Sequence, residues 1–140
     1  MDPYLQGDRL GRLLGEAYRQ WQAQSYGALA RKGYPDIRPA HSPVFRFIGR
    51  GATAKDLAAA AGIRKQSMAY LIKDLLGKGY VSEVPDERDR RAKRISLTAK
   101  GEKAHDALIA CSLAEEENLE AMIGGEALEQ LKSLLKAIGP

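Results

Sequence analysis

The sequence predicts a mostly α-helical fold (α+β in class) that carries one small β-hairpin. Apolar residues recur at helical spacing through most of the 140-residue chain. Two helical segments meet at a glycine turn, Gly62, and a short alternating stretch, Tyr80–Val84, follows them. A loop with five cations within residues 88–94 then leads into a second alternating stretch, Arg94–Leu97. This order of elements predicts a winged helix-turn-helix flanked by helical arms.

Length and composition are those of one compact domain. The one cysteine, Cys111, excludes an intramolecular disulfide and fits a reducing compartment. The N-terminus lacks the basic, apolar and small-residue pattern of a secretion signal, and no apolar run approaches about 18 residues. We therefore expect a cytoplasmic protein that does not span a membrane.

Charge is unevenly distributed along the chain. The net charge is +3 over residues 1–49, +6 over residues 50–101 and −5 over residues 102–140. A basic centre is where a nucleic-acid footprint would lie, and the acidic C-terminal part should face away from phosphate. Charge alone is equally compatible with ordinary solvated surfaces.

The first predicted element is a long amphipathic helix over Leu5–Lys32, where leucines and aromatic residues recur near the 3.6-residue period. Gly7, Gly11 and Gly15 lie four residues apart on one face, and each costs about 1 kcal/mol relative to alanine. Two interpretations stay open. Either another helix, such as one from a second subunit, approaches this face closely, or the N-terminal end of the helix is only weakly formed.

A proline-rich break follows, and Ser42–Ile48 is then predicted to form a short helix with Ser42 as N-cap and Pro43 at its first position. His41 immediately precedes this helix. We interpret it as a polar residue at the helix entry, with a ligand-pocket or phosphate contact as the alternative.

The helix-turn-helix begins at Thr53, which with Asp56 forms a capping box for a small, alanine-rich helix over residues 54–61. Gly62 ends that helix. The second helix, residues 65–76, buries a stripe made of Met68, Leu71, Ile72 and Leu75. Its opposite face carries Lys65, Gln66, Ala69, Tyr70 and Lys73, which are side chains that can contact base edges in a major groove. The alternative is an ordinary helical hairpin with a solvated face.

The hairpin formed by the two alternating stretches is the predicted wing. At its tip Arg91 can enter a minor groove, where narrow A·T tracts concentrate negative potential. We expect Asp89 to orient Arg91 or Arg90 through a charge-assisted pair. The competing explanation is that the acidic residues only lower the net charge of the loop.

The C-terminal part is predicted to be helical. Thr98 caps a helix that runs to about Ile123, and a glycine pair follows it. A last apolar seam consists of Leu128, Leu131, Leu135 and Ile138. Pairing of this seam with the first helix of a second copy would bury it and give a two-fold dimer, although packing within one chain is the alternative.

The wing segment Asp86-x-x-Asp89-Arg90-Arg91-Ala92-Lys93-x-Ile95-x-Leu97-Thr98-x-Lys100-Gly101 resembles the signature of the MarR (multiple antibiotic resistance regulator) family. Upstream, Thr53-x-x-x-Leu57-Ala58, Gly62-Ile63 and Leu71-Ile72-x-x-Leu75-x-x-x-Gly79-Tyr80-Val81 are similar to the helix-turn-helix of that family. The resemblance implies a homodimeric transcriptional regulator on pseudo-palindromic double-stranded DNA, usually a repressor released by a small ligand or an oxidant. It implies a single domain over 1–140, with dimerisation helices in 1–34 and 102–140 and the DNA-binding part in 40–101.

Site residues follow by position from this resemblance. The DNA-binding set is Thr53, Arg64, Lys65, Gln66, Ser67, Ala69, Tyr70, Lys73, Arg88, Arg90, Arg91 and Lys93, with Asp89 as the brace of the wing. Arg91 is the groove reader, while Arg88, Arg90 and Lys93 are phosphate contacts or solvated charge. The ligand-pocket set is Tyr18, Trp21, His41 and Phe45, with a small aromatic acid as the expected effector, although core packing explains the aromatic residues equally well.

Two departures from the family pattern bear on function. Arg64 stands where the recognition helix usually begins with Ser, Thr or Asp, so that it contacts a phosphate or the cap is lost. The reactive N-terminal cysteine of the peroxide-sensing members is missing, and Cys111 on an apolar helix face is predicted to be a core residue. Oxidant sensing is therefore disfavoured.

An enzyme is not expected. His41, His105 and Cys111 lack metal-ligand spacing, so we expect neither metal nor cofactor. Ser133-x-x-Lys136 matches an S-x-x-K catalytic motif only by chance, because it lies on an amphipathic helix. Two non-enzymatic alternatives to a regulator remain, a nonspecific architectural DNA-binding protein and a winged helix used for protein contacts.

Overall fold

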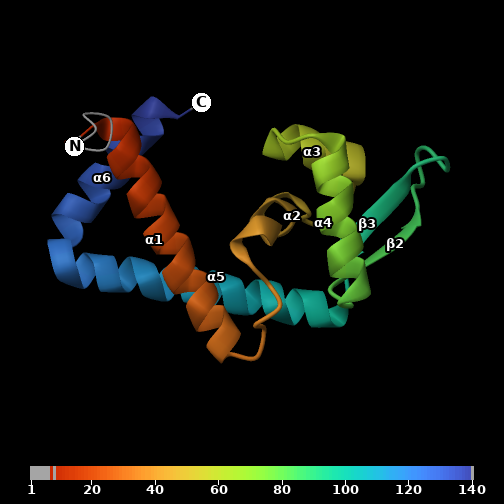
Figure 1. Ribbon diagram of the computed structural model, residues 1–140, viewed down its shortest axis with the longest axis horizontal. Coiled ribbons are helices and arrows are strands. Elements are labelled where there is room, and N and C mark those ends of the chain that lie inside the picture. The colour runs from red at the N-terminus through yellow and green to blue at the C-terminus, as the bar shows by residue number, and fades with distance from the viewer. Residues whose placement is uncertain (1–6, 8, 140) are drawn as a thin grey trace.

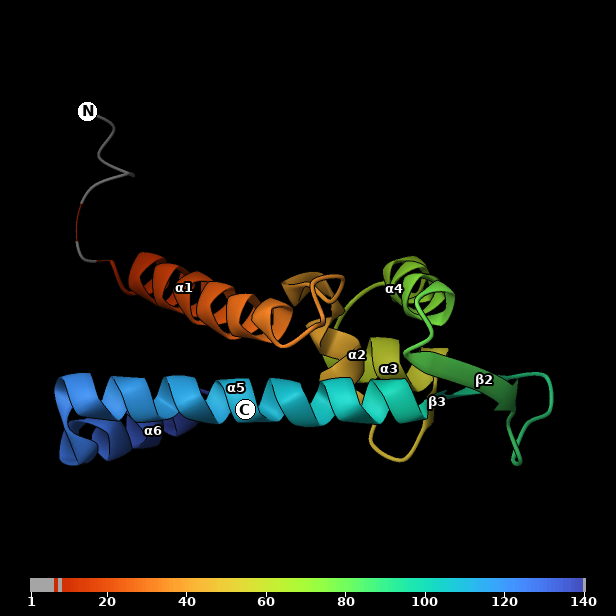
Figure 2. The same cartoon turned by 90° about the horizontal axis from the view of Figure 1, so that it is seen from below.

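Two lobes joined by one long helix make up the computed structural model, which describes residue 7 and residues 9–139 (Figure 1). The helical arm contains α1, the distal part of α5 and α6, and the other lobe contains the short helices and the sheet. Figure 2 shows α5 running from the arm to the base of the sheet. In order the elements are α1 (Leu10–Arg31), a 3-10 turn η1 (Pro39–His41), α2 (Ser42–Phe47), β1 (Ala52–Thr53), α3 (Ala54–Ala61), α4 (Lys65–Gly77), β2 (Val81–Pro85), β3 (Lys93–Leu97), α5 (Ala99–Ile123) and α6 (Gly125–Ile138).

The predicted helix-turn-helix is confirmed. The side chain of Thr53 accepts a hydrogen bond of 3.2 Å from the Asp56 N–H and so caps α3. Gly62 ends α3 in the left-handed region at φ 67°, which glycine adopts without strain. Met68, Ile72 and Leu75 of α4 are buried against Leu57 of α3 and the rest of the core. The stripe therefore turns the opposite side of α4 outward.

A sheet of three antiparallel strands in the order β1-β3-β2 replaces the expected two-stranded hairpin. Val81 pairs with Leu97 and Pro85 with Lys93. Each strand therefore extends one residue further toward the tip of the hairpin than predicted. The additional strand β1 is only two residues long, which is too short for an alternating pattern to predict it from the sequence. Gly51 precedes it at φ 122°, and a Cβ there would lie 2.7 Å from Arg94 Nε.

The N-terminus of α5 is fixed to the start of β2. Thr98 caps α5 as predicted, accepting from the Gly101 N–H at 3.0 Å, and its hydroxyl donates to the Gly79 carbonyl at 2.6 Å. The Thr98 N–H donates to the Tyr80 carbonyl at 3.0 Å. A Cβ at position 101 would overlap that same carbonyl oxygen, so only glycine fits this contact.

The first helix is shorter than predicted. Gly7 adopts φ 102° outside any helix, and α1 begins at Leu10, while residues 5, 6 and 8 lie outside the described part of the chain. Gly7 therefore does not share a helix face with Gly11 and Gly15. No atom lies within 4 Å of a Cβ built at Gly11 or Gly15, so no helix of the same described chain packs closely on them.

The entry to α2 also differs from the prediction. The 3-10 turn Pro39–His41 runs directly into α2, so Ser42 is the first helical residue and not an N-cap. Pro39 opens the turn because its fixed φ suits the first position of a helical turn.

The arm leaves apolar surface uncovered. Leu128 is buried and Lys132 of α6 pairs with Glu116 of α5, which holds the two helices together. Leu131, Leu135 and Ile138 of the predicted seam are nevertheless exposed. No helix of the described chain is long and apolar enough to span a membrane.

Candidate nucleic-acid interface

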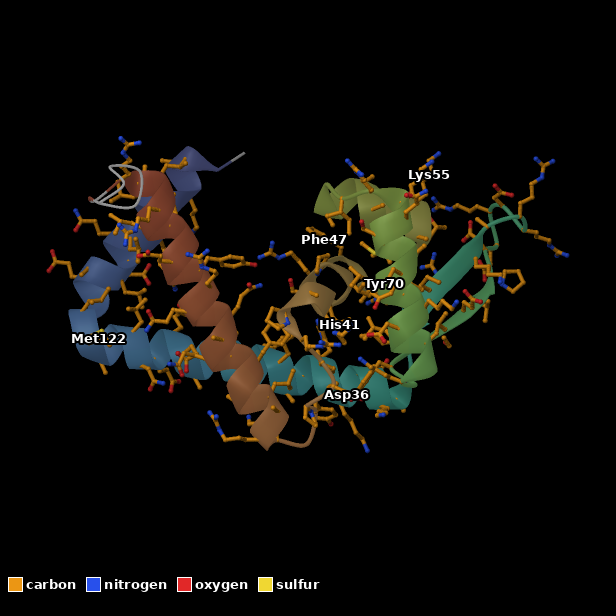
Figure 3. The ribbon with its side chains drawn as sticks, in the orientation of Figure 1. Asp36, His41, Phe47, Lys55, Tyr70 and Met122 are labelled. Atoms are coloured by element: carbon orange, nitrogen blue, oxygen red, sulfur yellow. The ribbon has the colours of Figure 1, made fainter. Side chains whose placement is uncertain are left out.

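The outward face of α4 carries the predicted DNA-reading side chains. Burial of the apolar stripe leaves all seven of them exposed, and Tyr70, labelled in Figure 3, is 72% exposed. They are Arg64, Lys65, Gln66, Ser67, Ala69, Tyr70 and Lys73. Arg64 occupies the N-cap position in extended backbone and makes no side-chain cap hydrogen bond. Its guanidinium therefore extends the cationic face without helping to start the helix.

Acidic side chains shape the tip of the wing by binding backbone. Asp86 is only 8% exposed, and its carboxylate accepts from the Asp89 N–H at 3.2 Å. Asp89 in turn accepts from the Arg91 N–H at 3.0 Å. The contact of Asp89 with Arg91 is thus made to the main chain, and the described contacts include no ion pair between Asp89 and an arginine. The exposed side chains of Arg88, Arg90 and Arg91 therefore project from a loop whose main chain is held by these hydrogen bonds.

The remaining wing cations have partners within the hairpin. Lys93 Nζ lies 3.1 Å from Glu83 on the neighbouring strand. Arg94 Nη1 lies 3.9 Å from Asp86. These two cations are partly neutralised, so the positive potential of the wing comes chiefly from its tip.

A hollow separates α4 from the wing, with a volume of about 580 Å³. Thr53, Lys55 and Lys73 line it on the helical side, and Asp89 and Lys93 line it on the side of the wing. Figure 3 shows Lys55 between α4 and the hairpin. Lys55 is absent from the predicted DNA-binding set. Its place in the first turn of the first helix of the motif is a signal for it, since that helix crosses the DNA backbone in such units.

A polar cluster holds the C-terminal half of α4 from the side opposite the hollow. His41 Nε2 lies 2.6 Å from Asp74 Oδ2, and Lys78 Nζ donates both to Asp74 Oδ2 and to the Asp36 carbonyl, each at 2.9 Å. The Tyr80 hydroxyl donates to Asp36 Oδ1 at 2.6 Å. We name these five residues, Asp36, His41, Asp74, Lys78 and Tyr80, the α4 tether (Figure 3 labels Asp36 and His41).

Electrostatics within the tether follow from these contacts. The hydrogen bonds from Lys78 and then from His41 hold the pKa of Asp74 below its ordinary value. Burial, and next the hydrogen bond to Asp36, raise the pKa of Tyr80 above its ordinary range. Asp74 is therefore ionised and Tyr80 protonated at neutral pH.

A second cavity of about 270 Å³ lies between α1, α2 and α5. Tyr18, Trp21 and Phe45 of the predicted ligand set line it together, and the Phe45 ring stacks on His105 at 6.2 Å. His41 is not among its lining residues, because the imidazole is engaged by Asp74. The Ser25 hydroxyl lines the cavity, is buried and has no hydrogen-bond partner among the residues that the structure describes.

Within the described residues, no three His, Cys, Asp or Glu side chains come together as a metal site. Cys111 is buried on α5, as predicted for a core residue. The chemistry that the outward face of α4 and the wing offer is recognition by cations, by the Gln66 amide and by the exposed phenol of Tyr70.

Comparison with known proteins gives a consistent result. Residues 36–92 match the model of the MarR family. The chain is 28% identical over 93 residues to the exopolysaccharide II synthesis transcriptional activator ExpG of Rhizobium meliloti (strain 1021). That match covers 66% of this chain and 48% of the relative, so the chain spans about half the length of the curated protein it matches.

Several solved structures share the fold. The apo form of wild-type MarR from E. coli superposes with a TM-score of 0.78 at 20% identity, covering 96% of this chain and 100% of that one. A cysteine-to-serine mutant of the same protein complexed with operator DNA gives 0.79 at 21% identity, with 94% of each chain covered. The transcriptional repressor CouR bound to a 23-mer DNA duplex gives 0.79 at 22% identity, covering 93% of this chain and 92% of CouR.

Proposed function

We propose that the chain is a transcriptional regulator of the MarR family, whose model its residues 36–92 match, and that it binds double-stranded DNA as a homodimer. The observation that carries the proposal is the exposed cationic and amide-bearing face of α4 beside the exposed arginine tip of the wing. A helix of this width fits a major groove, and a hairpin beside it reaches the adjacent minor groove. The DNA-bound neighbours share this arrangement of elements at similar TM-scores.

The proposed contacts divide by chemistry. Gln66 pairs with adenine, Lys65 or Lys73 with guanine, and Tyr70 or Ala69 with a thymine methyl group. Arg91 enters the minor groove, with its main chain held by Asp89. Phosphate contacts come from the remaining members of the predicted set, Thr53, Arg64, Ser67, Arg88, Arg90 and Lys93, together with Lys55 from the hollow.

A second copy is needed to cover the arm. Large apolar side chains are exposed on all three of its helices, and a stable monomer rarely leaves so much apolar surface in contact with water. They are Leu10, Leu13, Leu14 and Tyr18 on α1, Ile109, Leu113, Met122 and Ile123 on α5, and Leu131, Leu134, Leu135 and Ile138 on α6. A two-fold dimer through residues 1–34 and 102–140 would bury them and present two copies of α4 to half-sites one helical turn apart, about 34–36 Å.

The cavity between α1, α2 and α5 is the proposed effector site. Its aromatic lining favours a flat ligand, and the buried Ser25 hydroxyl and the Arg46 guanidinium can bind a polar or acidic group on it. A small aromatic acid fits this chemistry. The proposal covers repression and activation alike, since ExpG is named an activator and CouR a repressor.

The absence of catalysis and a cytoplasmic location are parts of the same proposal. A regulator that reads chromosomal DNA acts where that DNA lies, and the candidate residues form a recognition surface without a nucleophile held against a base.

Gel shifts over a salt series test the proposal. The probes are the DNA upstream of the gene that encodes the chain and a random duplex of equal length. We expect a specificity ratio of about a thousandfold or more, together with an affinity that falls steeply with salt. A ratio near one would leave the architectural alternative, and no binding to either probe would leave the protein-contact alternative.

A further inference from the structure

The α4 tether adds directional contacts to the apolar packing that holds the recognition helix. Met68, Ile72 and Leu75 hold α4 against the core by burial, which has no preferred direction. Hydrogen bonds prefer narrow ranges of distance and angle, so they restrict rotation and axial sliding as well. Asp74 lies four residues after Tyr70, which places it one turn, or about 6 Å, along the same face of the helix. Displacing this point therefore moves the side chains proposed to read bases.

His41 connects two parts of the chain, because both of its ring nitrogens make hydrogen bonds. The Arg38 N–H donates to His41 Nδ1 at 3.0 Å, so Nδ1 serves as an acceptor. The proton of the neutral ring consequently lies on Nε2, which donates to Asp74 Oδ2 at 2.6 Å. His41 is only 2% exposed, so its ring makes these two hydrogen bonds out of contact with bulk water. The main chain before α2 is thereby connected through one ring to α4.

Neither partner is placed to bind DNA itself. His41 is buried beneath the surface, and Asp74 carries a negative charge that phosphate would repel. Their hydrogen bond also joins residues 33 positions apart in the chain, so it links elements that no local interaction connects. Its effect on DNA must therefore pass through the position of α4.

We propose that His41 is a positioning residue for sequence readout, which through Asp74 sets the rotation and axial position of α4 in the major groove. The proposal rests on the function proposed above. Base readout requires side chains within about 0.5 Å of their productive positions, whereas phosphate attraction tolerates larger displacements. Loss of the contact should therefore reduce discrimination between sequences more than it reduces binding to DNA in general.

Two variants of similar size separate the two hydrogen bonds of the ring. The amide nitrogen of His41→Gln reaches the position of Nε2 and can still donate to Asp74. The shorter His41→Asn keeps an acceptor near Nδ1 for the Arg38 N–H but does not reach Asp74. The duplex is one that the wild-type chain selects from a random library, compared with the same duplex altered at single half-site positions and with a random duplex. Thermal unfolding and circular dichroism restrict the comparison to folded protein.

We expect His41→Asn to reduce the ratio of affinities for selected and altered half-sites by about tenfold, or about 1.4 kcal/mol, with affinity for random DNA within about twofold of wild type. His41→Gln should retain most of the ratio. Asp74→Ala should lower it at least as much as His41→Asn does, because it also removes the acceptor of Lys78, and the double variant should lower it no further than Asp74→Ala. The comparison of the double variant with the single variants remains valid even if one substitution lowers the stability of the fold.

Three results would overturn the inference. They are an unchanged ratio in His41→Asn, a loss of equal size on every duplex, and a His41→Gln variant that behaves like His41→Asn. If the wild-type chain selects no sequence from the library, the proposed function itself fails, and that failure is distinct because it appears before any variant is measured.

Discussion

Gly101→Ala should destabilise the fold, although alanine is the better helix former. The added methyl group would overlap the Tyr80 carbonyl oxygen, which is backbone and cannot rotate away. Overpacking of this kind costs about 1–3 kcal/mol. Moving the carbonyl would also weaken the 3.0 Å hydrogen bond from the Thr98 N–H, a loss of about 1 kcal/mol. Helix propensity returns about 1 kcal/mol, so the expected net loss is about 2 kcal/mol.

Urea denaturation followed by circular dichroism measures this loss, at one fixed protein concentration because a dimer gains stability with concentration. A decrease of about 2 kcal/mol lowers the midpoint by about 1 M. Gly77→Ala is the matched control, because a Cβ there meets no atom within 4 Å and the residue ends α4 in helical backbone. We expect it to stabilise the protein by up to about 1 kcal/mol. Equal shifts in both variants, or an unchanged midpoint in Gly101→Ala, would refute the reasoning.

Two further predictions concern the wing and the tether. Arg91→Ala should weaken binding to a selected duplex by about 1–3 kcal/mol in gel shifts and leave unfolding unchanged, whereas an unaltered affinity would remove Arg91 from the groove. Asp74→Asn should flatten the acid limb of the stability curve. The folded-state pKa of Asp74 is depressed, so its contribution is present above the unfolded value near 3.9 and is lost as pH falls through the folded value. Urea midpoints between about pH 6 and pH 2 measure this, and parallel curves for variant and wild type would contradict it.

The helix-turn-helix could be predicted because its signals are local. A capping threonine, a left-handed glycine and a buried stripe each leave a mark within a few residues, and Thr53, Gly62 and Met68 all behave as their patterns indicate. The strand β1 could not be found in this way. Its two residues acquire β structure only by pairing with Ile95 and Arg94, more than 40 positions away.

The hydrogen bond between His41 and Asp74 could not be predicted from the sequence for a related reason. Its position before a helix suggested an entry residue or a pocket residue, but a buried imidazole takes its function from the partner that reaches it. That partner, Asp74, lies 33 positions further along the chain, next to Lys73 of the predicted outward face, and no local pattern connects it to His41. For Asp89 the prediction was partly right. A contact with Arg91 was expected, but the Asp89 carboxylate accepts a hydrogen bond from the main-chain N–H of Arg91 and not from its guanidinium group.

Tyr80 connects the end of the recognition helix to the segment after α1 and to the start of α5. Its hydroxyl donates to Asp36 beyond the end of α1, its carbonyl accepts from Thr98 at the start of α5, and its ring lies 4.4 Å beneath the Lys100 ammonium group. The residue itself immediately precedes β2 and is buried. We therefore expect a displacement of α5, or of the segment that follows α1, to act on the point where α4 passes into the wing. Because packed interiors deform little, we expect such a displacement to shift α4 and the hairpin, the two elements proposed to contact DNA, together.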